Sequence, residues 1–183
     1  MLYSRLIKLA AATTFLAGGV AAQCNDSEGP DLLCYNESSG GVSQDVTEAD
    51  IKYVASYLRS YGAQTKAGRQ FTMTAADAPD CAEWTLYAHG TVLALGKHLD
   101  SSLNSSVLFS DIADTIDGGA SATPEQQAAA IYGCSTDGGS RAVGYDPANP
   151  QYNTAAYLAN GYTPKGILVK IVSSNAQLAA AVL

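Results

Sequence analysis

Four cysteines are spread along the chain, at positions 24, 34, 81 and 134, with spacings of 10, 47 and 53 residues. These spacings match no zinc motif, and an even set of cysteines pairs into disulfides in an oxidising compartment. If the chain is exported, we therefore expect two disulfides, with three possible pairings left open. Linking Cys34 or Cys81 to Cys134 would close a long loop and stabilise the fold by about 4 kcal/mol, against about 3 kcal/mol for a Cys24–Cys34 bond.

The first 22 residues have the layout of a secretory signal peptide. Arg5 and Lys8 form a basic start, an apolar stretch follows, and small residues precede Gln23. We expect cleavage after Ala22 and a secreted, extracellular product. The apolar stretch is shorter than the roughly 20 residues that a membrane-spanning helix needs, and no later segment reaches that length, so no membrane anchor is expected. The mature chain then divides into a cysteine-containing lead, 23–46, and a single domain, 47–183.

Composition and charge exclude several classes of protein. The chain has 183 residues, of which 47% are hydrophobic and 15% charged, which is typical of one globular domain. Seventeen acidic residues stand against ten basic ones, so the protein should not bind nucleic acid or anionic lipid. Three sequons, at Asn25, Asn36 and Asn104, could accept N-linked glycans in a eukaryotic host.

Several elements are indicated by caps and by hydrophobic spacing. Thr47 and Asp50 suggest a capping box for a helix that ends at Gly62. Residues 69–75 and 83–99 alternate like strands, with a hairpin turn or a bulge at Gly90. We expect further helices over 107–116 and 124–132, strands over 141–145 and 167–172, and a loop over 146–165. The predicted fold class is α+β, a mainly antiparallel sheet with two or three helices packed on one face.

No recognised catalytic signature is present in the sequence, and no cofactor is expected. His89 and His98 are the only histidines, and an exposed position in a strand or turn is the simpler interpretation of each. Asp111, Asp114 and Asp117 are three residues apart on the predicted helix. They could present paired carboxylates to a metal or a sugar, although a solvated helix face explains the same spacing.

Tyrosine is abundant near the predicted loop. Tyr152, Tyr157 and Tyr162 could stack on sugars or anchor a protein partner, or they could pack the loop onto the sheet. Trp84, which follows Cys81 closely, is expected in the core beside a disulfide.

The layout over about residues 34–145 resembles small secreted fungal effectors, in particular the necrosis-inducing extracellular effectors and the killer-toxin-like α/β sandwich proteins. The features that carry this resemblance are the cysteine-containing lead, the helix ending at Tyr61, the hairpin-rich middle and the return from Cys134 to Tyr145. The stretch 110–116, Ser-Asp-Ile-Ala-Asp-Thr-Ile, resembles the second helix of that family. The resemblance implies a disulfide-stapled virulence or necrosis-inducing factor and supplies no catalytic residues.

The sequence therefore predicts a secreted, non-enzymatic effector or interaction protein that acts on a host or competitor protein. One alternative is a cell-wall glycan-binding module that uses the late tyrosines. Another is a secreted enzyme that uses carboxylate chemistry at Asp111 and Asp114.

Overall fold

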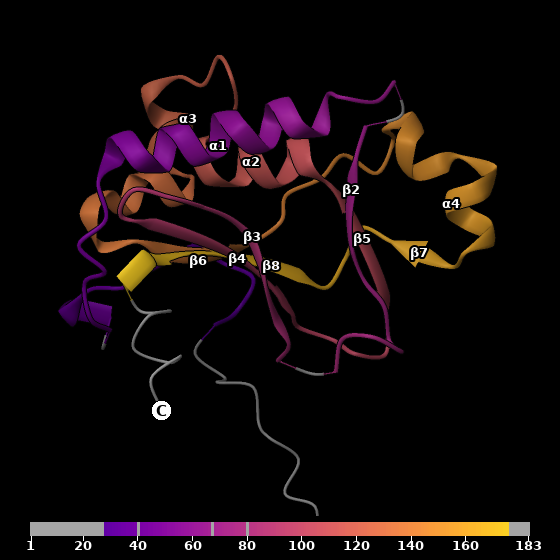
Figure 1. The fold of residues 1–183 in the computed structure, drawn as a ribbon, viewed down its shortest axis with the longest axis horizontal. Helices are drawn as coiled ribbons and strands as arrows, with labels where there is room; N and C mark the ends of the chain where they lie inside the picture. Colours follow the sequence, from indigo (N-terminus) through magenta and orange to yellow (C-terminus); the bar gives the residue numbers. More distant parts are fainter. Residues whose placement is uncertain (1–27, 40, 67, 80, 176–183) are drawn as a thin grey trace, which may run out of the picture.

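A computed structural model describes residues 28–39, 41–66, 68–79 and 81–175. Its main sheet has five antiparallel strands in the order β1-β6-β8-β4-β3, as Figure 1 shows. The strands are β1 (Leu33–Cys34), β3 (Glu83–His89), β4 (Val92–His98), β6 (Gly139–Ala142) and β8 (Ile167–Ser173).

A second sheet of three strands lies beside the first (Figure 1). In it β5 pairs antiparallel with β2 and parallel with β7. Its strands are β2 (Gln70–Met73), β5 (Asn104–Leu108) and β7 (Tyr162–Thr163).

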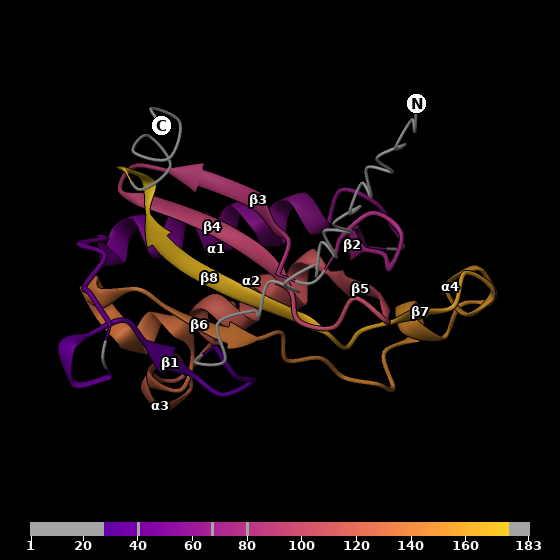
Figure 2. The same ribbon diagram turned by 90° about the horizontal axis from the view of Figure 1, so that it is seen from below.

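Helices α1 and α2 pack on one face of the main sheet, and Figure 2 shows both behind the strands. The fold is therefore α+β, as the sequence predicts. The α-helices are α1 (Glu48–Gly62), α2 (Phe109–Asp117), α3 (Pro124–Ala128) and α4 (Ala155–Ala159), and the 3-10 helices are η1 (Glu37–Ser39), η2 (Ile131–Asp137) and η3 (Pro150–Asn153).

Helix α1 begins as predicted, but its capping box is only half formed. The Thr47 hydroxyl accepts a hydrogen bond from the backbone N–H of Asp50. The Asp50 carboxylate accepts instead from the backbone N–H and the hydroxyl of Thr91, at 2.9 and 2.8 Å. Thr91 follows Gly90 in the β3–β4 turn, where φ is +53° and a Cβ would lie 2.4 Å from the Asp50 carboxylate. This contact therefore ties the start of α1 to the hairpin.

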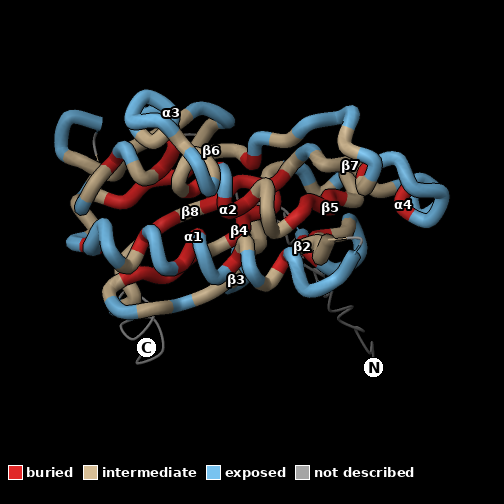
Figure 3. The backbone as a smooth tube through the Cα atoms, turned by 90° about the horizontal axis from the view of Figure 1, so that it is seen from above, coloured by how far each residue is buried: buried red, intermediate tan, exposed pale blue. Residues whose placement is uncertain are grey.

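The core lies between the helices and the main sheet. Ile51, Val54 and Leu58 of α1 are buried, and Ile112 and Ile116 of α2 join the same cluster. Figure 3 shows the buried side of α1 turned toward the strands. Strand β8 lies between β4 and β6 and is mostly buried, as its continuous apolar run predicts.

The opposite face of the main sheet carries an ion-pair network. Lys97 of β4 and Lys170 of β8 both contact the Glu28 carboxylate, and Lys170 also lies 2.8 Å from Glu83 of β3. Burial alone would raise the pKa of Glu28, but hydrogen bonds from the two lysines outweigh burial and hold that pKa below its usual range. The network fixes the segment before β1 against the sheet.

Several predicted boundaries were wrong. Val107 and Leu108 belong to strand β5 rather than to a helix, and α2 begins only at Phe109. Helix α3 stops at Ala128 instead of continuing to Tyr132, and β6 covers 139–142 rather than 141–145. The range predicted as a loop, 146–165, contains η3, α4 and β7. For Val107 and Leu108, pairing with Phe71 and Gln70 of β2 overrides the local helical pattern.

The structure confirms a disulfide between Cys34 of β1 and Cys134 of η2. Cys81 is also disulfide-bonded. Cys24, Asn25 and the predicted signal peptide, 1–22, lie outside the described residues. Within the described residues no helix is long and apolar enough to cross a membrane.

Candidate functional site

Tyr152, Tyr157 and Tyr162 pack ring against ring and attach the segment after β6 to strand β5. We call these three residues the tyrosine ladder. The Tyr152 hydroxyl donates to Asp111 at 2.5 Å and accepts from the backbone N–H of Leu108 at 2.9 Å. The Tyr157 hydroxyl donates to the carbonyl of Ser106 at 2.7 Å. The Tyr152 and Tyr157 rings are buried, with centroids 5.5 Å apart, and Tyr162 packs edge-on against Tyr157. The first two rings therefore pack the chain onto the sheet rather than offer their faces to a ligand.

The three aspartates of α2, Asp111, Asp114 and Asp117, have two different structural roles. Asp114 and Asp117 both accept hydrogen bonds from the Arg59 guanidinium of α1, at 2.8 and 2.6 Å, so they hold the two helices together. Asp111 faces the tyrosine ladder instead. Burial raises the pKa of Asp111, and the hydrogen bond from Tyr152 opposes that rise only in part.

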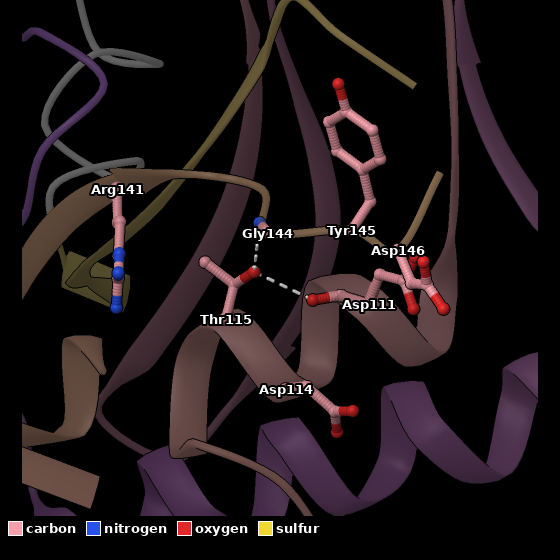
Figure 4. A pocket seen from close by; sticks show the side chains of 7 residues that line it. All are labelled: Asp111, Asp114, Thr115, Arg141, Gly144, Tyr145 and Asp146. Carbon is pink, nitrogen blue, oxygen red and sulfur yellow. Dashed lines mark hydrogen bonds between the residues drawn. The ribbon is translucent and has the colours of Figure 1, made fainter. Parts of the chain in front are cut away.

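A pocket of about 410 Å³ opens beside this row, and Figure 4 shows the residues that line it. The Thr115 hydroxyl donates to the carbonyl of Asp111 at 2.8 Å and accepts from the backbone N–H of Gly144 at 3.0 Å. These two bonds close one wall of the pocket. The full lining is Asp111, Asp114, Thr115, Arg141, Gly144, Tyr145 and Asp146.

Each of the three carboxylates that line the pocket accepts a hydrogen bond. Asp111 is held by Tyr152, Asp114 by Arg59, and Asp146 accepts from the backbone N–H of Ala148 at 2.9 Å. Across the described part of the chain, no group of three or more His, Cys, Asp or Glu side chains could hold a metal ion. The pocket is best explained as the junction between α2 and the segment after β6. The hypothesis of carboxylate catalysis here stays a prediction.

The two histidines lie in different environments. His98 is fully buried, not exposed, and bridges the two sheets. Its Nδ1 donates to the Ala78 carbonyl at 2.7 Å, and its Nε2 is hydrogen-bonded to the Ser105 hydroxyl at 3.1 Å. His89 is partly exposed at the end of β3 and stacks on Tyr53, with ring centroids 3.7 Å apart. The two imidazoles therefore do not form one site.

Aromatic side chains gather where α1 lies alongside β3, some of them exposed and others packed against the core. No sequence pattern identified this band, and Trp84, which is expected in the core from the sequence, is 37% exposed. We call it the aromatic strip. Its members are Tyr53, Tyr57 and Tyr61 of α1, Phe71 of β2, Trp84, Tyr87 and His89 of β3, and Phe109 of α2.

Ring contacts join the members of the aromatic strip into two groups, Tyr53 with His89 and the six other rings with one another. Tyr57 stacks on Tyr87, and Tyr61 meets Phe109 edge-on with centroids 4.9 Å apart. Phe71 makes edge contacts with both Phe109 and Trp84. Partial desolvation and the neighbouring Tyr53 and Tyr57 raise the pKa of the Tyr87 hydroxyl, so that hydroxyl stays protonated at neutral pH.

Three members of the aromatic strip are exposed. Tyr53 is 48% exposed and Tyr57 39%, and they and Trp84 are among the few large hydrophobic residues exposed in the described chain; Val42 and Leu158 are others. The spacing of Tyr53, Tyr57 and Tyr61, four residues apart on one helix, places them on one helix face. That spacing was the available signal, but sequence alone does not say which helix face meets solvent.

The two described sequons differ in accessibility. Asn36 is half-buried at the start of an exposed turn, where its side-chain oxygen accepts from the Ser38 hydroxyl and from the backbone N–H of Ser39. Asn104 begins strand β5, and the two serines of its sequon are fully buried.

Comparisons with known proteins found no matching family model, no matching curated protein and no matching solved structure.

Proposed function

We propose that the protein is an extracellular, non-enzymatic interaction protein that binds a protein of a host or competitor through the aromatic strip. The observation that carries this proposal is the set of partly exposed rings where α1 lies alongside β3, with Tyr53 stacked on His89 and Tyr57 stacked on Tyr87. Tyrosine and tryptophan dominate the energetic centres of protein interfaces, because they supply contact area at low entropic cost. Stacking has already ordered these rings, so a partner would not have to order them.

The ring geometry favours a protein partner over a glycan. Stacking on sugars uses the open face of an aromatic ring. In the aromatic strip, one face of Tyr53 is covered by His89 and one face of Tyr57 by Tyr87. One face of each of these rings is therefore unavailable to a sugar, and the tyrosine hydroxyls suit hydrogen bonds across a protein interface.

The contacts of the candidate catalytic groups support a non-enzymatic role. His98 is fully buried between the sheets, and the carboxylates of Asp111 and Asp114 each accept from a neighbouring side chain. The predicted signal peptide and the Cys34–Cys134 disulfide support an extracellular address.

The proposal is tested by infiltrating the purified, oxidised protein into living plant leaf and scoring cell death and defence signalling. A Tyr53→Ala/Tyr57→Ala variant removes two exposed rings. A Val42→Ala/Leu158→Ala variant removes two exposed hydrophobic residues outside the aromatic strip and serves as the control. We expect the parent and control proteins to give the same response and the strip variant to lose it. An equal response from all three would contradict the proposal, as would no response from the folded parent protein in a range of hosts.

A further inference from the structure

We infer that Arg69, at the Tyr61 end of the aromatic strip, pairs with an aspartate or glutamate side chain of the partner protein. This inference rests on the proposed function and adds the chemistry of the partner segment.

Arg69 is held in place by contacts on several sides. It directly precedes β2, where the chain returns from the end of α1 to the second sheet (Figure 1). Its guanidinium lies over the Tyr61 ring, 4.5 Å from the ring centroid, and its Nη1 donates to the Tyr61 hydroxyl at 3.0 Å. Its backbone N–H donates to the Gly62 carbonyl, and its carbonyl accepts from the backbone N–H of Phe109. The cation is therefore positioned before a partner binds, so binding does not have to order it.

The charge of Arg69 has no carboxylate partner among the residues that the structure describes. Arg59 pairs with two aspartates of α2, and the two lysines of the main sheet pair with glutamates. By contrast, the described residues accept one hydrogen bond from the five side-chain N–H donors of Arg69, and its buried Nε has no partner there. Charged groups that are withdrawn from water are normally paired. Arg69 thus keeps both charge and donors for an anionic group of the partner.

A carboxylate suits the geometry of this side chain. The face of a guanidinium stacks on a ring, whereas its N–H donors point outward in the guanidinium plane. An arginine that lies over a tyrosine can therefore still bind a carboxylate at its edge through two parallel hydrogen bonds.

The rings beside Arg69 favour an acidic residue that has aromatic neighbours. Tyr61 and Phe109 are both half-buried and meet edge-on, with centroids 4.9 Å apart. An ion pair is stronger beside such apolar groups than in open water. The adjoining rings of the aromatic strip offer contacts to aromatic side chains next to the acidic residue.

The acidic groups of the protein do not cancel this local attraction. The Asp50 carboxylate is bonded to Thr91 near the start of α1, and Tyr61 lies 11 positions further along that helix, about 16 Å away at 1.5 Å per residue. Salt largely screens charges at that separation, because the Debye length is about 10 Å at 0.1 M. The net charge of −7 therefore slows the approach of an acidic segment, while Arg69 decides the contact that forms.

The test begins with two peptides and the full oxidised protein. In one peptide aspartate alternates with phenylalanine, and in the other asparagine replaces each aspartate, which keeps the shape and removes the charge. Trp84, the only tryptophan of the chain and a member of the aromatic strip, reports binding by its emission. We expect a saturable change with the aspartate peptide and about tenfold weaker binding of the asparagine peptide, since the charge-assisted pair is lost.

Three variants then locate the contact. Arg69→Gln removes the cation, Arg69→Lys keeps the charge without the planar fork, and Lys66→Gln removes an exposed charge from the same loop as the matched control. We expect Arg69→Gln to bind the aspartate peptide about tenfold more weakly and to lose the preference for aspartate over asparagine. Arg69→Lys should be intermediate, and Lys66→Gln should bind like the parent.

Equal binding of the two peptides by the parent protein would overturn the inference, and this comparison needs no variant to fold. Absence of saturable binding would also overturn it, as would equal weakening by Arg69→Gln and Lys66→Gln. The leaf response separates such a failure from that of the proposed function. If the Tyr53→Ala/Tyr57→Ala variant loses the leaf response but the aspartate peptide does not bind, the interaction surface stands and the pairing with Arg69 is wrong. If the aspartate peptide binds through Arg69 but that variant keeps the response, the proposed function is wrong.

Discussion

The ring of Tyr57 on α1 stacks on the ring of Tyr87 on β3, with centroids 3.6 Å apart and planes inclined by 10°. This contact joins the helix to the edge strand at the protein surface. We expect it to contribute a coupling energy of about 1 kcal/mol in a double-mutant cycle of Tyr57→Ala and Tyr87→Ala, measured by urea unfolding. Strictly additive effects of the two substitutions would show that the rings merely lie side by side.

His98 should be far more important for stability than His89. Replacing His98 with Ala leaves the Ala78 carbonyl and the Ser105 hydroxyl without their buried partner and opens a cavity between the sheets. We expect a loss of about 3 kcal/mol for His98→Ala and less than about 1 kcal/mol for the partly exposed His89→Ala. Comparable urea midpoints for the two variants would contradict the bridging role of His98.

The Glu28 network should make stability fall in acid. Because the pKa of Glu28 is lowered in the folded state, its contribution is present above the ordinary glutamate pKa of 4.5 and is lost as pH falls through the lower folded pKa. We expect Glu28→Gln to cost about 2 kcal/mol at neutral pH, less than for a fully buried pair because Glu28 remains partly solvated. This cost should shrink as the pH is lowered below 4.5, as followed by urea unfolding at several pH values. A cost that does not change with pH would rule out the ionic explanation.

Asp111 should show the opposite dependence on pH. Its pKa is raised in the folded state, chiefly by burial, so its stabilising effect is complete below the unfolded pKa and is lost as pH rises through the folded pKa. Asp111→Asn keeps an acceptor for the Tyr152 hydroxyl and removes the buried charge. We therefore expect the variant to gain stability relative to the parent as the pH rises toward neutrality, and thermal unfolding would measure this. A variant that loses stability over the same range would show that the Asp111 charge is used.

The Cys34–Cys134 disulfide spans 100 residues of sequence, so its removal should be costly. A Cys34→Ser/Cys134→Ser variant is expected to lose about 4 kcal/mol through loop-closure entropy. Calorimetry of the variant and the oxidised parent would measure the difference. An unchanged melting temperature would contradict the expectation.

Of the two described sequons, Asn36 should carry a glycan and Asn104 should not. Asn36 lies in an exposed turn, while the strand that holds Asn104 pairs on both sides and buries the serines of the sequon. Secretion from yeast followed by intact-mass measurement tests this, with Asn36→Gln and Asn104→Gln as the paired variants. Loss of glycan mass in Asn104→Gln alone would reverse the assignment.

Some elements could be predicted because the sequence states their boundaries locally. Thr123 and Gln126 form both hydrogen bonds of the predicted capping box, and Gly118 ends α2 in the left-handed conformation that favours glycine. Gly90 lies in the predicted turn between β3 and β4. In each case a few neighbouring residues determine the backbone.

Other features depend on contacts that are distant in sequence. The Asn-Ser-Ser start of β5 resembles an exposed turn, yet its serines are buried because Ser105 binds His98 and Ser106 binds Thr72. The aromatic strip was missed for a similar reason. Periodicity groups Tyr53 with Tyr57, but only the position of β3 alongside α1 leaves these rings at the surface.

The central claim, that the aromatic strip is the binding surface, is tested most directly by competition on living leaf tissue. Parent protein carrying a fluorescent label at its amino terminus is bound to the tissue and displaced with unlabelled proteins. Unlabelled parent and the Val42→Ala/Leu158→Ala control should displace it equally, and folded Tyr53→Ala/Tyr57→Ala protein should displace it at least about tenfold less effectively. Equal displacement by the strip variant would contradict the claim and move the binding surface elsewhere on the protein.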